Sequence, residues 1–396
     1  MKSQWTQFGR DSDGAFRILI VIAACWFFAQ GLRLSFPVLL PHISLEYGLD
    51  IATGGLLISL LFGAYAIGQF PGGVLGDWVG ERNVLAASMT LVVFGTVLVF
   101  GFERLEAVVV GIGLLGFGCG MFAPARFTIL SDVFEERDGV AHGVTMAVGD
   151  VGNTILPVLA GFLAVAIAWR YGVGYAVPIL LLLVIALWVT IPERTSAPPE
   201  SAVLSRTMLR DVGRSLSRPE VAAIFIVLLV QSFIFQGHTG LYPTYLVTEK
   251  GFSEEHASVL LGLFFGSAAV MNLIAGVAAD RFGKVMVIGI LSVVGTAAFG
   301  LLPVVTSLPT VIIVTVFTSA PIGVVTVALP YLIETLPENM RGTGFGILRT
   351  TYIALTAVSP FIIGSLGNIG HFDVGIWLFG AATALSFVVS RTLSSP

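Results

Sequence analysis

One charged, glycine-rich stretch separates two long apolar runs of this chain: Gly72-Gly73-Val74-Leu75-Gly76-Asp77-Trp78-Val79-Gly80-Glu81-Arg82-Asn83-Val84-Leu85. Gly68, Gly72 and Gly76 follow one another every fourth residue, so they place small side chains on one helix face, where another helix can approach closely. Asp77 and Arg82 come next, where the chain leaves the apolar run. The stretch predicts a helix that ends at a membrane surface, a turn at Gly80 and a second helix.

The whole chain is too apolar for a water-soluble domain. Of its 396 residues, 56% are hydrophobic and 11% are charged, whereas soluble domains carry about 25% charged residues. The net charge is -4, and no basic face of the kind that binds nucleic acid is visible. We therefore expect an all-α membrane protein whose partners are the lipid bilayer and a small solute, with no nucleic acid.

About twelve apolar segments are long enough to cross a bilayer, which takes roughly 20 residues. They span residues 16–40, 53–76, 83–102, 107–131, 141–168, 173–191, 221–246, 257–279, 284–303, 310–334, 343–366 and 374–391. Lysine and arginine gather in alternate connections, and such residues collect on the cytoplasmic side. We expect a multi-pass plasma-membrane protein, a monomer, with both termini in the cytoplasm.

A long polar segment, 192–219, divides the chain into predicted six-helix bundles at 1–191 and 220–396. Its second part carries Arg206, Arg210, Arg214 and Arg218 at four-residue spacing, beside a neighbouring apolar stripe. A helix with one basic and one apolar face suits the surface of an anionic leaflet. A partly disordered linker with a positive-inside bias is the alternative.

The two halves of the sequence resemble each other at a nearly fixed offset, which indicates an internal duplication. The matched groups are Gln30-Gly31 and Pro37 with Gln236-Gly237 and Pro243; Asp77 and Gly80 with Asp280 and Gly283; Asp132 with Glu334; Gly143 with Gly346; and Pro157 and Gly161 with Pro360 and Gly364. Two homologous bundles imply a pseudo-two-fold axis along the membrane normal and a solute site near the midplane.

The glycine-rich break resembles the signature loop of the major facilitator superfamily (MFS), in a prokaryotic form. The pattern is Gly73-x-Leu75-x-Asp77-x-x-Gly80-x-Arg82, with a weaker copy at Gly276-x-x-x-Asp280-Arg281-x-Gly283-Lys284. Trp78, where the family usually has a basic residue, and the acidic Glu81 depart from it. The resemblance implies twelve transmembrane helices in two pseudo-symmetric bundles that rock to give alternating access.

The same resemblance implies gating roles at the membrane surface for Gly73, Asp77, Gly80, Arg82, Asp280 and Arg281. Asp132 with Arg137, and Glu334 with Arg341, resemble charge pairs that the superfamily places after its fourth and tenth spans; ordinary exposed ion pairs are the alternative. Phe122-Ala123-Pro124-Ala125 and the following glycines resemble a branch that includes antibiotic-efflux carriers, although the tight Gly-Pro pair of the antiporter motif is missing.

Polar residues inside the apolar runs are the candidates for substrate binding or coupling, because a charge at mid-bilayer costs roughly 3 kcal/mol. They are Arg33, Arg126, Asp150, His238 and Arg349, accompanied by Gln30, Gln236, Tyr242 and Tyr352. Arg126 and Asp150 could form a structural pair, Arg33 could extend to the outer surface, and His238 could be a packing residue. Asp150 and His238 are the candidates for carrying a proton.

An excess of buried arginines over acids favours an anionic solute, since guanidinium groups match carboxylate and phosphate. We expect a secondary active transporter of a small organic anion, a symporter or antiporter coupled to protons or another ion. A proton-coupled drug or metabolite efflux carrier and a non-transporting sensor or scaffold are the alternatives. The sequence has no phosphate-binding loop, metal-ligand cluster or serine-nucleophile motif, so we expect no enzyme, cofactor or metal site.

Overall fold

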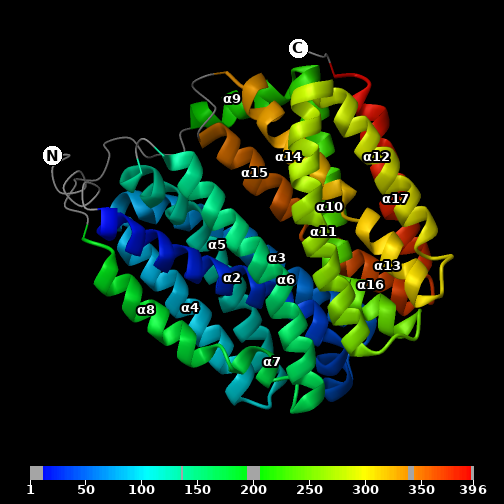
Figure 1. The fold of residues 1–396 in the computed structure, drawn as a ribbon, viewed down its shortest axis with the longest axis horizontal. Helices are drawn as coiled ribbons and strands as arrows, with labels where there is room; N and C mark the ends of the chain where they lie inside the picture. Colours follow the sequence, from blue (N-terminus) through cyan, green and yellow to red (C-terminus); the bar gives the residue numbers. More distant parts are fainter. Residues whose placement is uncertain (1–11, 135–136, 194–205, 338–342, 394–396) are drawn as a thin grey trace. The chain divides into compact units, whose positions relative to one another are not determined.

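The computed structural model describes residues 12–134, 137–193, 206–337 and 343–393, and all regular secondary structure in these ranges is α-helical (Figure 1). The helices are α2 Ser12–Tyr47, α3 Ile51–Val79, α4 Glu81–Gly101, α5 Leu105–Val133, α6 Asp138–Ala166, α7 Tyr171–Gly174, α8 Val177–Thr190, α9 Arg206–Leu216, α10 Pro219–Thr248, α11 Glu254–Phe282, α12 Lys284–Leu301, α13 Leu308–Phe317, α14 Ala320–Thr335, α15 Thr343–Thr356, α16 Ser359–Asn368 and α17 Phe372–Ser390. The all-α prediction is confirmed.

Twelve helical segments of the described ranges are long and apolar enough to cross a membrane, as predicted. Three of them are built from two helices each, because the chain breaks between α7 and α8, between α13 and α14 and between α15 and α16. Pro178, Pro321 and Pro360 lie in the first turns of α8, α14 and α16. Proline has no amide hydrogen to donate and is tolerated best in a first turn, which explains where the second helices begin.

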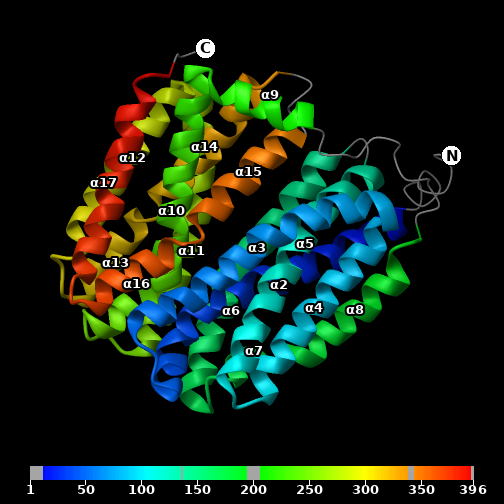
Figure 2. The same cartoon turned by 180° about the vertical axis from the view of Figure 1, so that it is seen from behind.

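The chain divides into two compact units. Unit 1 holds the described residues of Met1–His42 and Leu60–Ala202, and unit 2 holds those of Ile43–Ser59 and Val203–Pro396. In unit 1, α4 packs against α5 and α8 (Figure 2). In unit 2, α12 and α17 lie side by side, and α10 contacts α14, α15, α16 and α17. The chain therefore crosses between the units three times, after His42, after Ser59 and within the polar segment 192–219.

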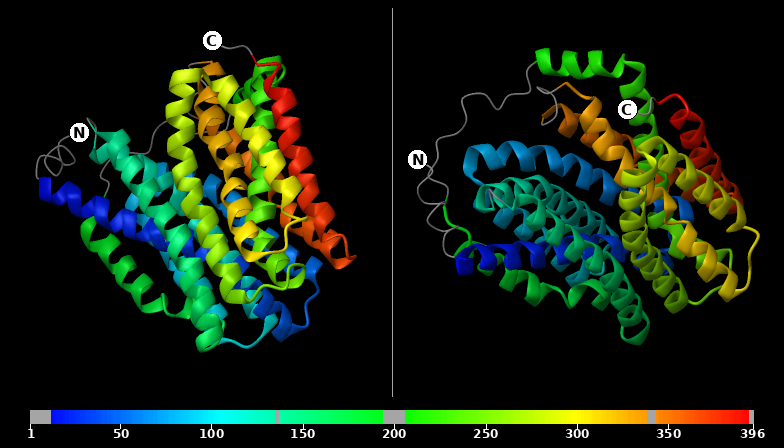
Figure 3. Two further views of the ribbon diagram at one scale, coloured as in Figure 1. Left: turned by 45° about the vertical axis from the view of Figure 1, so that its right-hand side comes forward. Right: turned by 45° about the horizontal axis from the view of Figure 1, so that its top comes forward.

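The amphipathic helix predicted in the polar segment is α9, which contacts α10 and α15 of unit 2 (Figure 3). Its Val212 is buried and Leu216 packs against the same apolar core, while Arg210 and Arg214 are exposed. The described apolar residues of α9, Val212 and Leu216, are therefore covered by unit 2 and do not lie open to a lipid surface.

Turn glycines repeat between the two halves of the chain with the same backbone geometry. Gly80 has φ +87° and ψ 149°, and Gly283 has φ +85° and ψ 148°. Gly48 and Gly251 have φ +64° and +68°. Each pair is 203 residues apart. These positive φ values favour glycine, so the duplication seen in the sequence extends to the backbone of two turns.

Helix caps repeat at the same spacing. The backbone amide of Thr53 donates to the carboxylate of Asp50 at 2.7 Å at the start of α3. The amide of His256 donates to the hydroxyl of Ser253 at 3.3 Å at the start of α11. Asp50 and Ser253 are also 203 residues apart. A side-chain acceptor at this position satisfies one of the otherwise unpaired amides of a first helical turn.

Candidate functional site

The glycine stripe of the opening stretch positions α5 in unit 1. A Cβ atom added at Gly68 would lie 2.3 Å from the carbonyl oxygen of Phe117, and one at Gly72 would lie 2.4 Å from that of Met121. Gly76 has open space around the equivalent point. Two of the three glycines thus allow α3 and α5 to touch through their backbones, which fixes α5 just before Arg126.

Arg126 lies in the interior of unit 1 with 1% of its surface exposed. Its guanidinium carbon is 3.9 Å from the ring centre of Trp26 on α2 and 4.5 Å from that of Phe127. Nη2 contacts the sulfur of Met146 on α6 at 3.3 Å. Cation–π contacts stabilise a guanidinium that has left water. Arg126 therefore joins three helices of unit 1 at one charged group.

Asp150 lies on α6 and is partly buried. The polar groups that act on its carboxylate include Asn153, on the same helix, and Arg126. Its neighbour Gly149 brings α6 close to α2, because a Cβ there would lie 2.4 Å from Nε1 of Trp26. The structure thus brings two predicted site residues, Arg126 and Asp150, into one neighbourhood of α2, α5 and α6.

Arg33, further along α2, is buried with 6% exposure. Its guanidinium carbon lies 4.0 Å from the ring centre of Tyr65 and 5.7 Å from that of Phe62, both on α3. Gln30 is partly buried on the same helix. The buried position of Arg33 in unit 1 differs from the alternative in which its head extends to the outer surface.

In unit 2, His238 of α10 is surrounded by aromatic rings and is 1% exposed. The ring centres of Tyr242, Phe264 and Phe299 lie 4.5, 5.1 and 5.1 Å away, and that of Phe379 lies 6.2 Å away. The hydroxyl of Tyr242 hydrogen bonds to Thr315 of α13. These surroundings are those of a packed interior, so His238 and Tyr242 occupy a core position in this structure.

Gln236 is part of a polar network between α10 and α15. Its Nε2 donates to Thr356 Oγ1 at 2.6 Å, to the carbonyl oxygen of Ile353 at 3.0 Å and to Ser232 Oγ at 3.2 Å. Tyr352 is buried next to this network, and Arg349 is partly buried one turn before it. The network holds α10 against α15 and fixes the orientation of the Gln236 amide.

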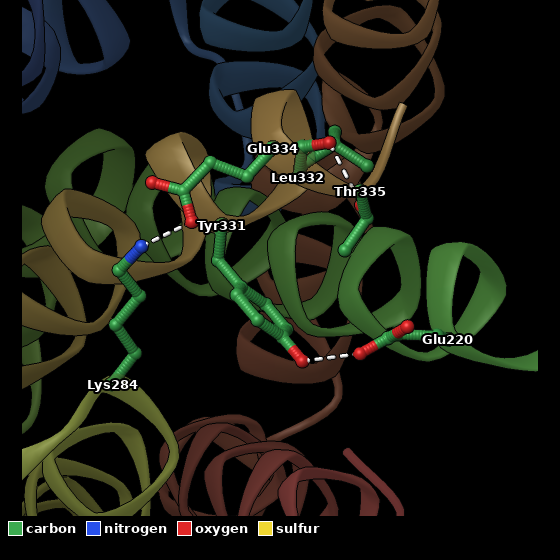
Figure 4. Close-up of polar contacts among 6 residues, drawn as sticks. All are labelled: Glu220, Lys284, Tyr331, Leu332, Glu334 and Thr335. Atoms are coloured by element: carbon green, nitrogen blue, oxygen red, sulfur yellow. Dashed lines mark hydrogen bonds and ion pairs between the residues drawn. The ribbon is translucent and has the colours of Figure 1, made fainter. Parts of the chain in front are cut away.

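The gating candidate Glu334 pairs with Lys284, at the start of α12 (Figure 4). On the preceding turn of α14, the hydroxyl of Tyr331 donates to Oε1 of Glu220 on α10 at 2.5 Å. Lys284 Nζ also lies 6.0 Å from the ring centre of Tyr331. Three helices of unit 2 are therefore connected at this end by two polar contacts.

In unit 1, Arg82 lies 4.4 Å from the ring centre of Trp188 and 3.7 Å from Glu193, so it ties the start of α4 to the end of α8. Gly73 packs loosely near Pro124, since a Cβ there would be 3.9 Å away. The remaining gating candidates divide by exposure: Arg137, Asp280 and Arg281 are exposed and Asp132 is partly buried. The side chain of Asp77 and all of Arg341 lie outside the described residues.

Sequence reasoning missed the residues that complete the Arg126 neighbourhood and the contacts at the end of unit 2. Trp26 and Met146 lie in apolar runs, and nothing in their spacing sets them apart from the other apolar residues there. Tyr331 was absent from the predicted set for the same reason, whereas Lys284 was part of the weaker copy of the signature loop but was not among the gating candidates. Their roles follow from contacts between helices.

The family model of the Major Facilitator Superfamily matches residues 19–266 and 224–396. Two uncharacterized MFS-type transporters of Mycobacterium tuberculosis are 27% identical over 165 residues, which is 41% of this chain and 24% of each relative. The cis,cis-muconate transport protein of Acinetobacter baylyi is 23% identical over 88% of this chain and 87% of that protein.

The crystal structure of a bacterial homologue of the human lysosomal transporter Spinster shares the fold, with a TM-score of 0.76 and 15% identity. The match covers 96% of this chain and 98% of that protein. The chain therefore belongs to the Major Facilitator Superfamily, whose members are membrane transporters and not enzymes, and its described residues hold twelve helical segments that could cross a membrane.

Proposed function

We propose that this transporter carries a small organic anion by secondary active transport, and that Arg126 binds the anionic group. The observation that supports this most directly is the buried guanidinium of Arg126, which contacts the rings of Trp26 and Phe127 inside unit 1. Such cation–π contacts stabilise the positive charge without using its N–H donors. Its N–H groups point outward in the plane, and this edge is the part that recognises carboxylate and phosphate.

The contact between Arg126 and Met146 is compatible with such a role. A thioether sulfur is a weak acceptor, so an anionic oxygen is a better partner for the same N–H group. Arg33, buried against Tyr65, adds a second positive charge to unit 1. A relative that spans most of this chain is named for the transport of cis,cis-muconate, a carboxylate, which agrees with an anionic substrate.

Asp150 is our candidate for coupling to protons. An anion at Arg126 competes with the Asp150 carboxylate for the same positive charge, and a proton on Asp150 removes this competition. Anion binding and protonation then favour each other, as a symporter requires. His238, the other candidate from the sequence, is enclosed by aromatic rings in the core of unit 2.

The test of the binding site is a thermal-shift screen of the purified protein against carboxylates, sugar phosphates and lipophilic cations. We expect one or more anions to raise the melting temperature of the wild type, and Arg126→Gln to lose that rise. Arg104→Gln is the matched control, because Arg104 is exposed between α4 and α5 and should leave the rise intact. Arg349→Gln tests the arginine of unit 2 in the same way. Retention of the full rise by Arg126→Gln would contradict the proposal.

Coupling and direction are tested in proteoliposomes under an imposed pH gradient. Wild-type protein should move the anion that the screen identifies, and its apparent affinity should rise as the pH falls. Asp150→Asn should bind the anion at least as tightly as the wild type but lose the pH dependence. Stabilisation by lipophilic cations alone, with proton-driven export, would instead favour the efflux carrier.

A further inference from the structure

A groove of about 850 Å³ lies on the surface of unit 2, where the end of α11, the start of α12 and the end of α17 meet. Helices α12 and α17, which form its walls, run side by side (Figures 1 and 3). Residues that line it include Asp280, Lys284, Ile290, Val293, Phe387 and Arg391. None of these residues belongs to the Arg126 neighbourhood in unit 1, so the groove is a separate feature.

Charged side chains gather at one end of the groove. Lys284 is the first residue of α12 and Arg391 caps the end of α17, while Asp280 lies in the last turn of α11. Lys284 pairs with Glu334, and an ammonium group has two further N–H donors. Arg391 is exposed, and its guanidinium carbon lies 5.6 Å from the ring centre of Phe387. Two cations therefore face the groove beside one carboxylate.

The rest of the groove is apolar. Met286, Ile290 and Val293 follow one another along α12 with about half of each surface exposed. Lys284 and Val293 are nine residues apart, which corresponds to about 13 Å of helix. Gly289 has no side chain that would fill the space between α12 and Phe387, and a Cβ atom added there would lie 3.6 Å from the nearest carbon of Phe387. A charged end and a long apolar slot on a membrane-spanning unit match an amphiphile.

We propose that this groove binds a glycerophospholipid. The phosphodiester lies between Arg391 and Lys284, which offer charge-assisted N–H donors to its oxygens. One acyl chain follows Met286, Ile290 and Val293 along α12. The apolar slot favours a lipid over free phosphate, because phosphate has no acyl chain that could fill the slot. The lipid also bridges α12 and α17, which both line the groove.

The test is native mass spectrometry of the full-length protein in detergent with added phosphatidylglycerol. Diacylglycerol with the same acyl chains is the comparison that lacks the phosphate. We expect one tightly bound phosphatidylglycerol, and Arg391→Gln should weaken it on the order of tenfold, the loss of one charge-assisted hydrogen bond. Arg281→Gln is the matched control, because Arg281 is exposed nearby but does not line the groove.

Gly289→Leu provides a second, independent variant, because its side chain fills the apolar slot and leaves the charges in place. It should weaken phosphatidylglycerol binding, and melting curves without lipid should show that it folds. Wild-type affinity in both Arg391→Gln and Gly289→Leu would overturn the proposal. Equal binding of diacylglycerol would overturn the role of the phosphate, and equal binding of inorganic phosphate would overturn the assignment to a lipid.

Discussion

Replacing Gly283 by alanine should destabilise unit 2 through the backbone alone. Gly283 joins α11 to α12 with φ +85° and ψ 148°, a region that only glycine occupies readily. An added Cβ would meet no atom within 4 Å, so steric contact with neighbouring side chains contributes nothing. The expected cost is therefore that of the strained conformation, about 1–3 kcal/mol.

The matched control is Gly276→Ala, seven residues earlier inside α11. A Cβ there also meets nothing within 4 Å, but the backbone is helical. Alanine in a helix interior is about 0.5–1 kcal/mol better than glycine. The same substitution should therefore lower stability at one position and raise it at the other, with a difference of about 1.5–4 kcal/mol between the two variants.

The assay is thermal unfolding of the two variants and the wild type in one detergent, followed by tryptophan fluorescence. A loss of 1 kcal/mol lowers the melting temperature by about 2–4 °C in a domain of 150–250 residues, so Gly283→Ala should melt several degrees below the wild type. Gly276→Ala should melt at or above it. If Gly283→Ala is as stable as Gly276→Ala, the strain assigned to this turn is wrong.

Two further predictions concern charges at helix ends. Hydrogen bonds from Thr53 and from Asn368 hold the pKa of Asp50 below its ordinary value. The stability that the ionised carboxylate contributes is complete above about pH 3.9, the ordinary pKa, and is lost as the pH falls through the lower pKa of the folded state. Asp50→Ser should therefore remove part of the fall in melting temperature between pH 5 and pH 3. The exposed pair of Lys284 with Glu334 should show a coupling of about 0.2–1 kcal/mol in a double-mutant cycle that shrinks in high salt, and a coupling above about 2 kcal/mol would contradict this.

The architecture was predictable because it depends on properties that the sequence displays directly. Length and hydropathy of the apolar runs determine how many helices cross the bilayer, and the glycines at 80 and 283 mark turns whose φ values favour glycine. The offset of 203 residues between the two halves also follows from Gly80 and Gly283. The helix breaks before Pro178, Pro321 and Pro360 were not predicted, because proline is common inside the unbroken spans as well.

The candidate site was predictable only in part. Arg126 and Asp150 stood out because a charge inside an apolar run is costly unless a partner group or a polar cavity stabilises it. Trp26 and Met146, which contact Arg126, could not be recognised, because these helices are apolar on every side and their periodicity does not say which face meets which neighbour. The covered apolar face of α9 was missed for a similar reason, since an amphipathic pattern fits a protein surface as well as a lipid one.

The duplication does not extend to the charges, and this difference bears on mechanism. At the offset of 203 residues, Asp150 of α6 corresponds to Ile353 of α15, and Met146 of α6, which contacts Arg126, corresponds to Arg349 of α15. The acid that we link to proton coupling therefore has no counterpart in the other copy, and neither arginine is matched at the same offset, because Arg126 corresponds to Leu329 and Arg349 to Met146. Asp150→Asn should abolish the response of transport to a pH gradient, while Arg349→Gln should weaken anion binding and leave the pH response in place.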